Sequence, residues 1–72
     1  MAKTRQAFDE AQIERAVGFT TSRFMGRGRF DTRRFDTQGE AEADARGDAR
    51  AMVYAVTPEG FTIHIINGDQ IA

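Results

Sequence analysis

The sequence predicts an α+β fold, with a short N-terminal helix followed by a β-α-β-β arrangement around a small, mostly antiparallel sheet. Two capping-box patterns, at residues 9–12 and 37–40, mark the starts of two helices. Two runs of β-branched and apolar residues, 51–57 and 61–66, read as strands joined by a hairpin loop. A chain of 72 residues fits one domain, so we expect residues 1–72 to fold as a unit.

The first helix is expected over residues 10–17. Asp9 occupies the N-cap position, and Gln12 completes the capping box three residues later. Phe8 precedes the cap as one half of a hydrophobic staple, and Gly18 fits the residue that ends a helix. The flanking residues 1–7, like residues 68–72 at the other end, are expected to be loose.

The stretch RFDTRRFDT, residues 29–37, repeats Phe-Asp-Thr with two different roles. Phe30 and Phe35 lie five residues apart and cannot enter one core from one unbroken strand. We therefore expect a strand over 29–34, with Phe35 folded back over the second helix. That helix begins after the Thr37 cap, runs over 38–46 on alanine residues and ends at Gly47. Residues 19–25, which precede the break at Gly26-Arg27-Gly28, have the composition of an extended segment.

The loop Thr57-Pro58-Glu59-Gly60 predicts a three-residue hairpin connection with Gly60 in the left-handed conformation. It sets Thr57 opposite Phe61, and the pairs that follow are Ala55–Ile63 and Val53–Ile65. The expected core face then consists of Ala51, Val53, Ala55, Phe61, Ile63 and Ile65. The other face carries Met52, Tyr54, Val56, Thr62, His64 and Ile66. It is too apolar to leave in water. Neighbouring strands and the first helix cover it, or another subunit or partner does, and Met52, Tyr54, His64 and Ile66 form a possible second contact face.

Charge is unevenly distributed along the chain. Residues 23–35 hold five Arg against Asp31, and residues 36–48 hold five carboxylates against Arg46, although the net charge is only −1. The two blocks either neutralise each other in neighbouring elements or leave a positive face for a phosphate or an acidic partner. In the second case the expected partner-binding residues are Arg23, Arg27, Arg29, Arg33 and Arg34.

The sequence offers little chemistry for catalysis. His64 is the single histidine and Ser22 the single serine, and there is no cysteine. A metal site usually needs three or four ligands, so we expect no catalytic, metal-binding or cofactor-binding residues and no enzymatic activity. No apolar run approaches 18 residues, and no signal-peptide pattern is present, which predicts a cytoplasmic protein without a membrane partner.

The segment RRFDTQGEAEADARGDARAMVYAVTPEGFTIHI, with its strand, short alanine-rich helix and hairpin, resembles the layout of small phage-encoded inhibitors of the anti-CRISPR type. That resemblance implies a non-enzymatic interaction protein that occludes a nucleic-acid-processing complex, its arginine face touching acidic residues or guide RNA. The passage FDTQGEAEADA is also similar to the strand-to-helix passage of integrase arm-type DNA-binding domains. The alternative function is therefore a small nucleic-acid-binding module. The expected partner is a protein or ribonucleoprotein complex, with nucleic acid and a homodimer as further possibilities.

Overall fold

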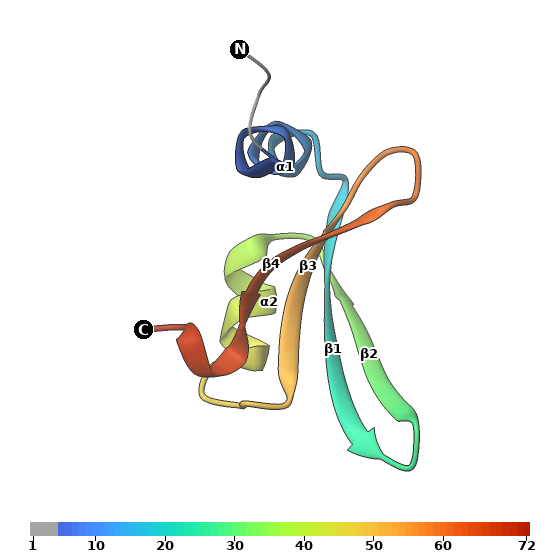
Figure 1. Cartoon of the computed structure of the whole chain (residues 1–72), viewed down its shortest axis with the longest axis vertical. Helices are drawn as coiled ribbons and strands as arrows, with labels where there is room; N and C mark the ends of the chain where they lie inside the picture. Colours follow the sequence, from blue (N-terminus) through green and yellow to red (C-terminus); the bar gives the residue numbers. More distant parts are fainter. Residues whose placement is uncertain (1–4) are drawn as a thin grey trace.

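A computed structural model describes the backbone of residues 5–72 and the side chains of residues 10–72. The α+β class is confirmed: two helices accompany one four-stranded antiparallel sheet. In chain order the elements are α1 (Arg5–Glu14), β1 (Gly18–Gly26), β2 (Arg29–Phe35), α2 (Gln38–Ala45), β3 (Ala51–Val56), β4 (Thr62–Asn67) and the short 3-10 helix η1 (Gly68–Gln70). Figure 1 shows the β1–β2 hairpin projecting beyond one end of the body, with α1 across the opposite end.

The sheet has the strand order β2-β1-β3-β4, and each neighbouring pair is antiparallel. The expected β-α-β-β arrangement is therefore wrong in one respect, because residues 18–26 form a full strand and the described order is β-β-α-β-β. β1 occupies a central position, paired with β2 on one side and β3 on the other. The connection from β2 through α2 to β3 consequently passes over β1.

The turn between β1 and β2 consists of Arg27 and Gly28. Both residues have positive φ angles, 55° and 72°, as a two-residue hairpin turn of type I′ requires. Gly26 pairs with Arg29 across this turn, and a register shift between Phe24 and Gly26 leaves Met25 as a bulge. The turn thereby sets Phe24 opposite Phe30 on the same face of the sheet.

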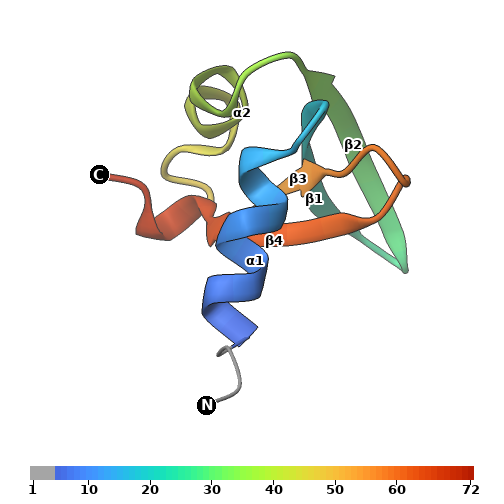
Figure 2. The same cartoon turned by 90° about the horizontal axis from the view of Figure 1, so that it is seen from above.

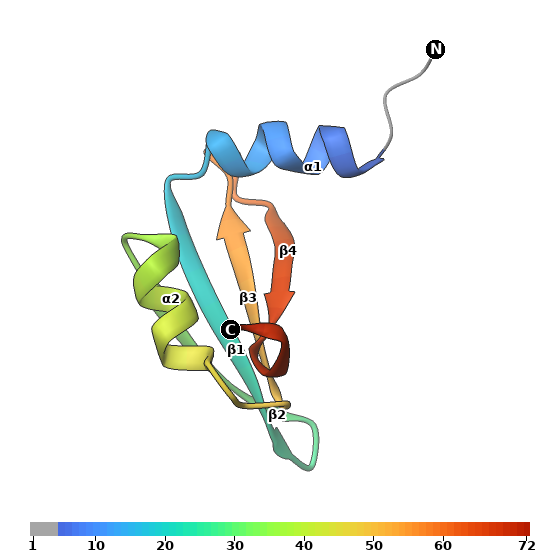
Figure 3. The ribbon, with the colours of Figure 1, turned by 90° about the vertical axis from the view of Figure 1, so that its left-hand side faces the viewer.

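Helix α2 begins as the sequence predicts. The Thr37 side chain accepts a hydrogen bond from the Glu40 backbone N–H, and the Glu40 carboxylate accepts one from the Thr37 backbone N–H. Ala41 and Ala45 are fully buried where α2 approaches one face of the sheet (Figures 2 and 3). Phe35 packs against this same core, which agrees with its expected position over the helix start.

The core is small and mostly aliphatic. Its fully buried members are Ala41, Ala45, Ala51, Val53 and Ala55. The partly buried residues packed against the cluster of the first four are Phe19, Phe35, Ile65, Ile66 and Ile71. Burial of apolar surface stabilises a fold by about 25 cal/mol per Å², and an alanine face buries little such surface. Polar contacts between α2 and the sheet, described below, add to this modest hydrophobic attachment.

The β3–β4 hairpin follows the expected register only near its loop. Thr57 and Phe61 face each other through a backbone hydrogen bond, Gly60 has a φ of 91°, and Ala55 pairs with Ile63. A register shift between Val53 and Tyr54 then sets Val53 opposite Ile66, where Ile65 was expected. Because of this additional residue in β4, Ile66 lies on the face of the sheet opposite to the one expected.

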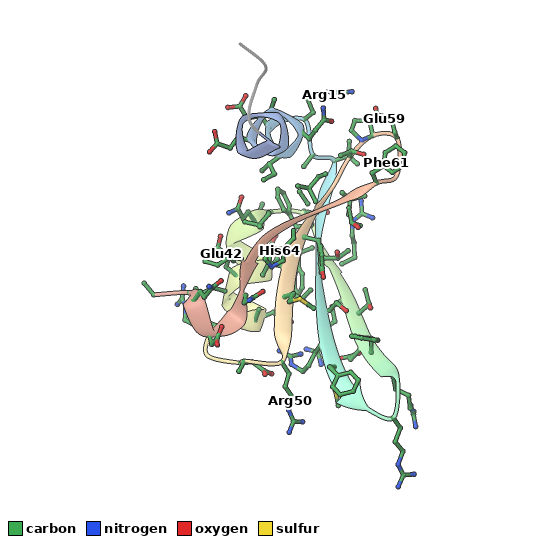
Figure 4. All side chains as sticks on the ribbon, in the orientation of Figure 1. Arg15, Glu42, Arg50, Glu59, Phe61 and His64 are labelled. Atoms are coloured by element: carbon green, nitrogen blue, oxygen red, sulfur yellow. The ribbon has the colours of Figure 1, made fainter. Side chains whose placement is uncertain are left out.

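Phe61 does not belong to the core, contrary to expectation, because its side chain is 68% exposed at the β3–β4 loop. Arg15 reaches the same loop and donates to the Glu59 carboxylate at 3.0 Å. Figure 4 shows these two side chains together at the end of the molecule that carries Phe61. Both partners are about half exposed, so this ion pair is worth at most about 1 kcal/mol.

The C-terminal end differs from the loose segment that the sequence led us to expect. Gly68 is buried, and Ile71 packs against the core, so residues 68–71 are part of the folded structure. α1 runs from Arg5 to Glu14, whereas a helix over 10–17 was expected. The predicted roles of Phe8 and Asp9 concern side chains outside the described residues, as does the loose tail for residues 1–4.

Candidate binding surface

The hairpin tip, residues 26–29, carries two of the five arginines of the basic block. Arg27 and Arg29 are both exposed, and within residues 10–72 neither guanidinium forms an ion pair or a side-chain hydrogen bond. An open depression of about 580 Å³ beside them is lined by Met25, Gly26, Arg27, Arg29, Phe30 and Asp31. The tip therefore presents cationic groups in a projecting position.

Arg23 is not available for a partner. Its Nε donates to Oδ2 of Asp48, and its Nη2 donates to the backbone carbonyl of Asp44 at 3.1 Å. Only 17% of its side chain is exposed. The hydrogen bond from Arg23 lowers the pKa of the Asp48 carboxyl, and the backbone N–H of Arg50 lowers it further. The same hydrogen bond to Asp48 raises the pKa of Arg23.

Arg33 is also engaged by the protein's own carboxylates. Its Nε donates to Asp31 at 3.1 Å and its Nη1 donates to Asp44 at 2.9 Å. Thr21, fully buried in the neighbouring strand, donates its hydroxyl to the other oxygen of Asp44 at 2.9 Å. We call Thr21, Arg23, Arg33, Asp44 and Asp48 the Asp44 network. It fastens α2 to the sheet and removes two of the five predicted arginines from the binding surface.

Arg34 lies on the opposite face of β2 from Arg33, as strand alternation requires. Its guanidinium occupies the space over Gly18, where an added Cβ would come within 2.3 Å of Nε and Nη2. Arg34 is exposed and has no carboxylate partner among the described side chains. The basic surface therefore consists of Arg27, Arg29 and Arg34.

The face of the sheet opposite α2 is covered by no helix in the described part of the chain (Figure 2). Strand alternation and the pairing registers define this uncovered face as Thr20, Ser22, Phe24, Phe30, Thr32, Arg34, Met52, Tyr54, Val56, Thr62 and His64. It contains Met52, Tyr54 and His64 of the predicted second contact face. Ile66 is wrongly assigned to that face, because the shift in β4 places it opposite Val53 and against the core.

Two aromatic pairs stand on the uncovered face. Phe24 and Phe30, on neighbouring strands, have ring centroids 5.4 Å apart in an edge-to-face arrangement. Tyr54 and His64 form a similar pair, with centroids 5.6 Å apart. The Phe24–Phe30 pair was missed from sequence, because it depends on the bulge at Met25 as well as on the turn.

The ends of the second pair are held by side-chain hydrogen bonds. The Tyr54 hydroxyl donates to Sδ of Met52 at 3.4 Å, and Nε2 of His64 lies 2.7 Å from Oδ1 of Asn67. Among residues 10–72, no group of three or more His, Cys, Asp or Glu side chains is placed to hold a metal ion. The His64 ring contacts the Tyr54 ring and the Asn67 side chain.

No protein-family model matches the chain, and neither a curated protein nor a solved structure is significantly similar to it. Neither of the two helices that the structure describes is long and apolar enough to cross a membrane.

Proposed function

We propose that the protein is a small non-enzymatic interaction protein of the phage inhibitor type, which occludes a nucleic-acid-processing complex in the cytoplasm. Its contact surface is the hairpin tip with Arg27 and Arg29, extended by Arg34 on the adjoining sheet face. This set replaces the five arginines expected from sequence. In this proposal the N-terminal helix closes one end of the sheet and leaves the tip unobstructed.

The observation that carries the proposal is the contrast among the arginines. Arg23 and Arg33 are fixed by Asp44 and its neighbours, whereas Arg27 and Arg29 extend from a projecting turn with no ion-pair partner in residues 10–72. A guanidinium presents a planar set of donors that suits carboxylates and phosphates. Such groups at a protruding tip favour contact with an acidic protein surface or with nucleic acid held in a complex.

The proposal also rests on the resemblance in size and layout to anti-CRISPR inhibitors. An inhibitor that acts by occlusion needs no reacting groups, only a surface that competes with a substrate. A two-residue turn with positive φ at Arg27 and Gly28 holds the cationic tip at the end of the hairpin.

A plasmid-interference assay tests the proposal. Cells carrying an active CRISPR–Cas system and expressing the protein are transformed with a targeted plasmid, one system type per strain. We expect wild type to restore transformation in at least one strain by tenfold or more. The double variant Arg27→Asn/Arg29→Gln should abolish that protection. Asn at position 27 tolerates the positive φ, so the turn is retained.

Arg46→Gln is the matched control, because Arg46 is an exposed arginine that caps α2 and is not part of the hairpin tip. It should protect as well as wild type does. An absence of protection in every strain, with the protein detected by immunoblot, would remove the inhibitor function. Equal protection by the tip variant would remove the tip as the contact surface.

A further inference from the structure

We infer that the uncovered face of the sheet binds single-stranded RNA, whose bases stack on Phe24, Phe30, Tyr54 and His64 while Arg34 contacts the phosphates. This inference goes beyond the proposed function and does not depend on it. It concerns the aromatic residues of the sheet face, which adjoin the proposed contact surface and share Arg34 with it, and a ligand that can be tested with the purified chain alone.

The exposure of the phenylalanine pair is the first argument. Phe24 is 43% exposed and Phe30 is 55% exposed, and both stand on regular strands. An edge-to-face pair leaves the face of at least one ring open to a third aromatic group. Proteins that bind single strands use such rings, because every base has a π-face that can stack.

The spacing of the two aromatic pairs is the second argument. Thr20 pairs with Tyr54, and Phe24 lies four residues further along the same strand. At a rise of about 3.4 Å per residue, the two pairs are separated by about 14 Å along β1. The Tyr54 hydroxyl and the His64 ring are held by Met52 and Asn67, so the second pair is oriented before any ligand binds. Two aromatic stacking positions on one face of the sheet suit a short stretch of unpaired bases.

Charge is the third argument. The uncovered face has Arg34 and no carboxylate among its described residues, while Asp44 and Asp48 lie in the Asp44 network on the α2 side and Asp31 accepts a hydrogen bond from Arg33 of that network. A chain with a net charge of −1 therefore keeps its acidic groups away from this one face. That separation fits a polyanionic ligand, since a phosphate backbone would meet a cation and no repelling charge.

The polar residues between the aromatic pairs favour RNA over a second copy of the chain. Ser22 and Thr32 place two hydroxyl groups between the two pairs, and Thr20 adds a third beside Tyr54. Stable homodimer interfaces are more apolar at their centre, and a two-fold contact would bring two Arg34 side chains onto one buried surface. Hydroxyl groups can exchange hydrogen bonds with the ribose 2′-OH, the group by which proteins distinguish RNA from DNA.

Fluorescence anisotropy with a labelled 12-nucleotide oligouridine tests the inference, alongside the DNA oligomer of matching sequence and a duplex RNA. We expect the single-stranded RNA to bind more tightly than either. Phe30→Leu and Phe24→Leu should each weaken binding by about tenfold, since each removes one stacking ring. The logarithm of affinity should fall with the logarithm of salt concentration with a slope of about −2, for about three phosphates contacted by Arg34, Arg27 and Arg29.

Phe61→Leu is the matched control. It removes a ring that is more exposed than Phe24 or Phe30, at 68%, from the β3–β4 loop, away from the uncovered face, and should leave the affinity unchanged. Phe30 lies on an edge strand, so Phe30→Leu is the variant least expected to affect folding, and circular dichroism checks each protein.

Several results would overturn the inference. Equal binding of the DNA oligomer would contradict the assignment to RNA, and equal loss with Phe61→Leu would contradict the sheet face. Dimerisation in sedimentation that Phe24→Leu abolishes would show that a second copy occupies the face. RNA binding without protection in the plasmid assay would leave this inference intact and remove the proposed function.

Discussion

Arg23 of β1 and Asp48 of the loop after α2 form an ion pair across the layer between helix and sheet. The Arg23 guanidinium also donates to the carbonyl of Asp44, at the end of the same helix. A residue of the basic block thereby neutralises a residue of the acidic block, 25 positions further along the chain. Arg23 and Arg33 are thus neutralised within the fold, whereas Arg27, Arg29 and Arg34 have no ion-pair partner among residues 10–72, and a partner for them stays a prediction.

The Asp48 carboxyl makes the free energy of unfolding depend on pH in the acid range. Arg23 lowers the pKa of Asp48 in the folded state, so its stabilising contribution is complete above the unfolded pKa of about 3.9 and is lost as the pH falls through the folded pKa. We expect Asp48→Asn to lower the free energy of unfolding at pH 7. Urea titrations should show the difference from wild type shrinking below about pH 4. A difference that stays constant between pH 7 and pH 3 would contradict this role.

Thr21 should contribute to stability through its hydroxyl rather than its bulk. The side chain is fully buried and donates to Asp44, so Thr21→Val keeps the shape and removes the hydrogen bond. We expect a loss of about 1.5–3 kcal/mol in the free energy of unfolding, the range for hydrogen bonds to charged groups. Thr32→Val on exposed β2 is the control and should change stability by less than about 0.5 kcal/mol.

Gly68 allows β4 to end close to α2. A Cβ at this position would lie 2.3 Å from the backbone carbonyl oxygens of both Ala45 and Asp48, and backbone cannot move aside cheaply. Gly68→Ala should therefore destabilise the fold by about 1–3 kcal/mol, measured as a shift in the urea midpoint. Gly39→Ala, in α2 with open space around it, should be neutral or stabilising by up to about 1 kcal/mol. Equal effects of the two variants would show that the close approach is not constraining.

Arg27 occupies the turn at a conformational cost. Its φ of 55° lies in the left-handed region, which Asn and Gly adopt more readily. We expect Arg27→Asn to raise the free energy of unfolding by about 0.5–1 kcal/mol, measured as a higher melting temperature. The same variant should lower the affinity for an anionic partner. Arg27→Val should lower stability, because β-branched residues resist positive φ. A destabilising Arg27→Asn would indicate that the guanidinium supports the fold.

Much of the fold could be predicted because local signals agree with the final structure. Thr37 and Glu40 form the expected capping box, and Gly60 has the expected positive φ in the second hairpin. β1 was not recognised as a central strand because its buried face carries Thr21 and Arg23. Polar residues such as these can be buried beneath a helix only when the helix supplies hydrogen-bond partners for them. Their partners, Asp44 and Asp48, lie more than 20 positions away in sequence, so the pairing could not be read locally.

The binding surface was harder to predict for the same reason. Whether an arginine is available depends on which carboxylates the fold brings to it, and neighbouring Arg33 and Arg34 have opposite outcomes. The position of Ile66 depends on one additional residue in β4, which no turn signal marks. The Phe24–Phe30 pair depends on the bulge at Met25 as well as on the Arg27-Gly28 turn, since the turn alone would set Met25 opposite Phe30.

The central place of β1 also has a consequence for how the chain folds. β1 can pair with β2 as soon as both have emerged, but its other edge must wait for β3, which follows α2. Pairs such as Gly18 with Val56 join distant parts of the chain, so their closure comes at a high entropic cost. The rate-limiting event should accordingly be the docking of a preformed N-terminal hairpin onto the C-terminal one, and the kinetics should resemble those of slower mixed α/β domains rather than helical bundles.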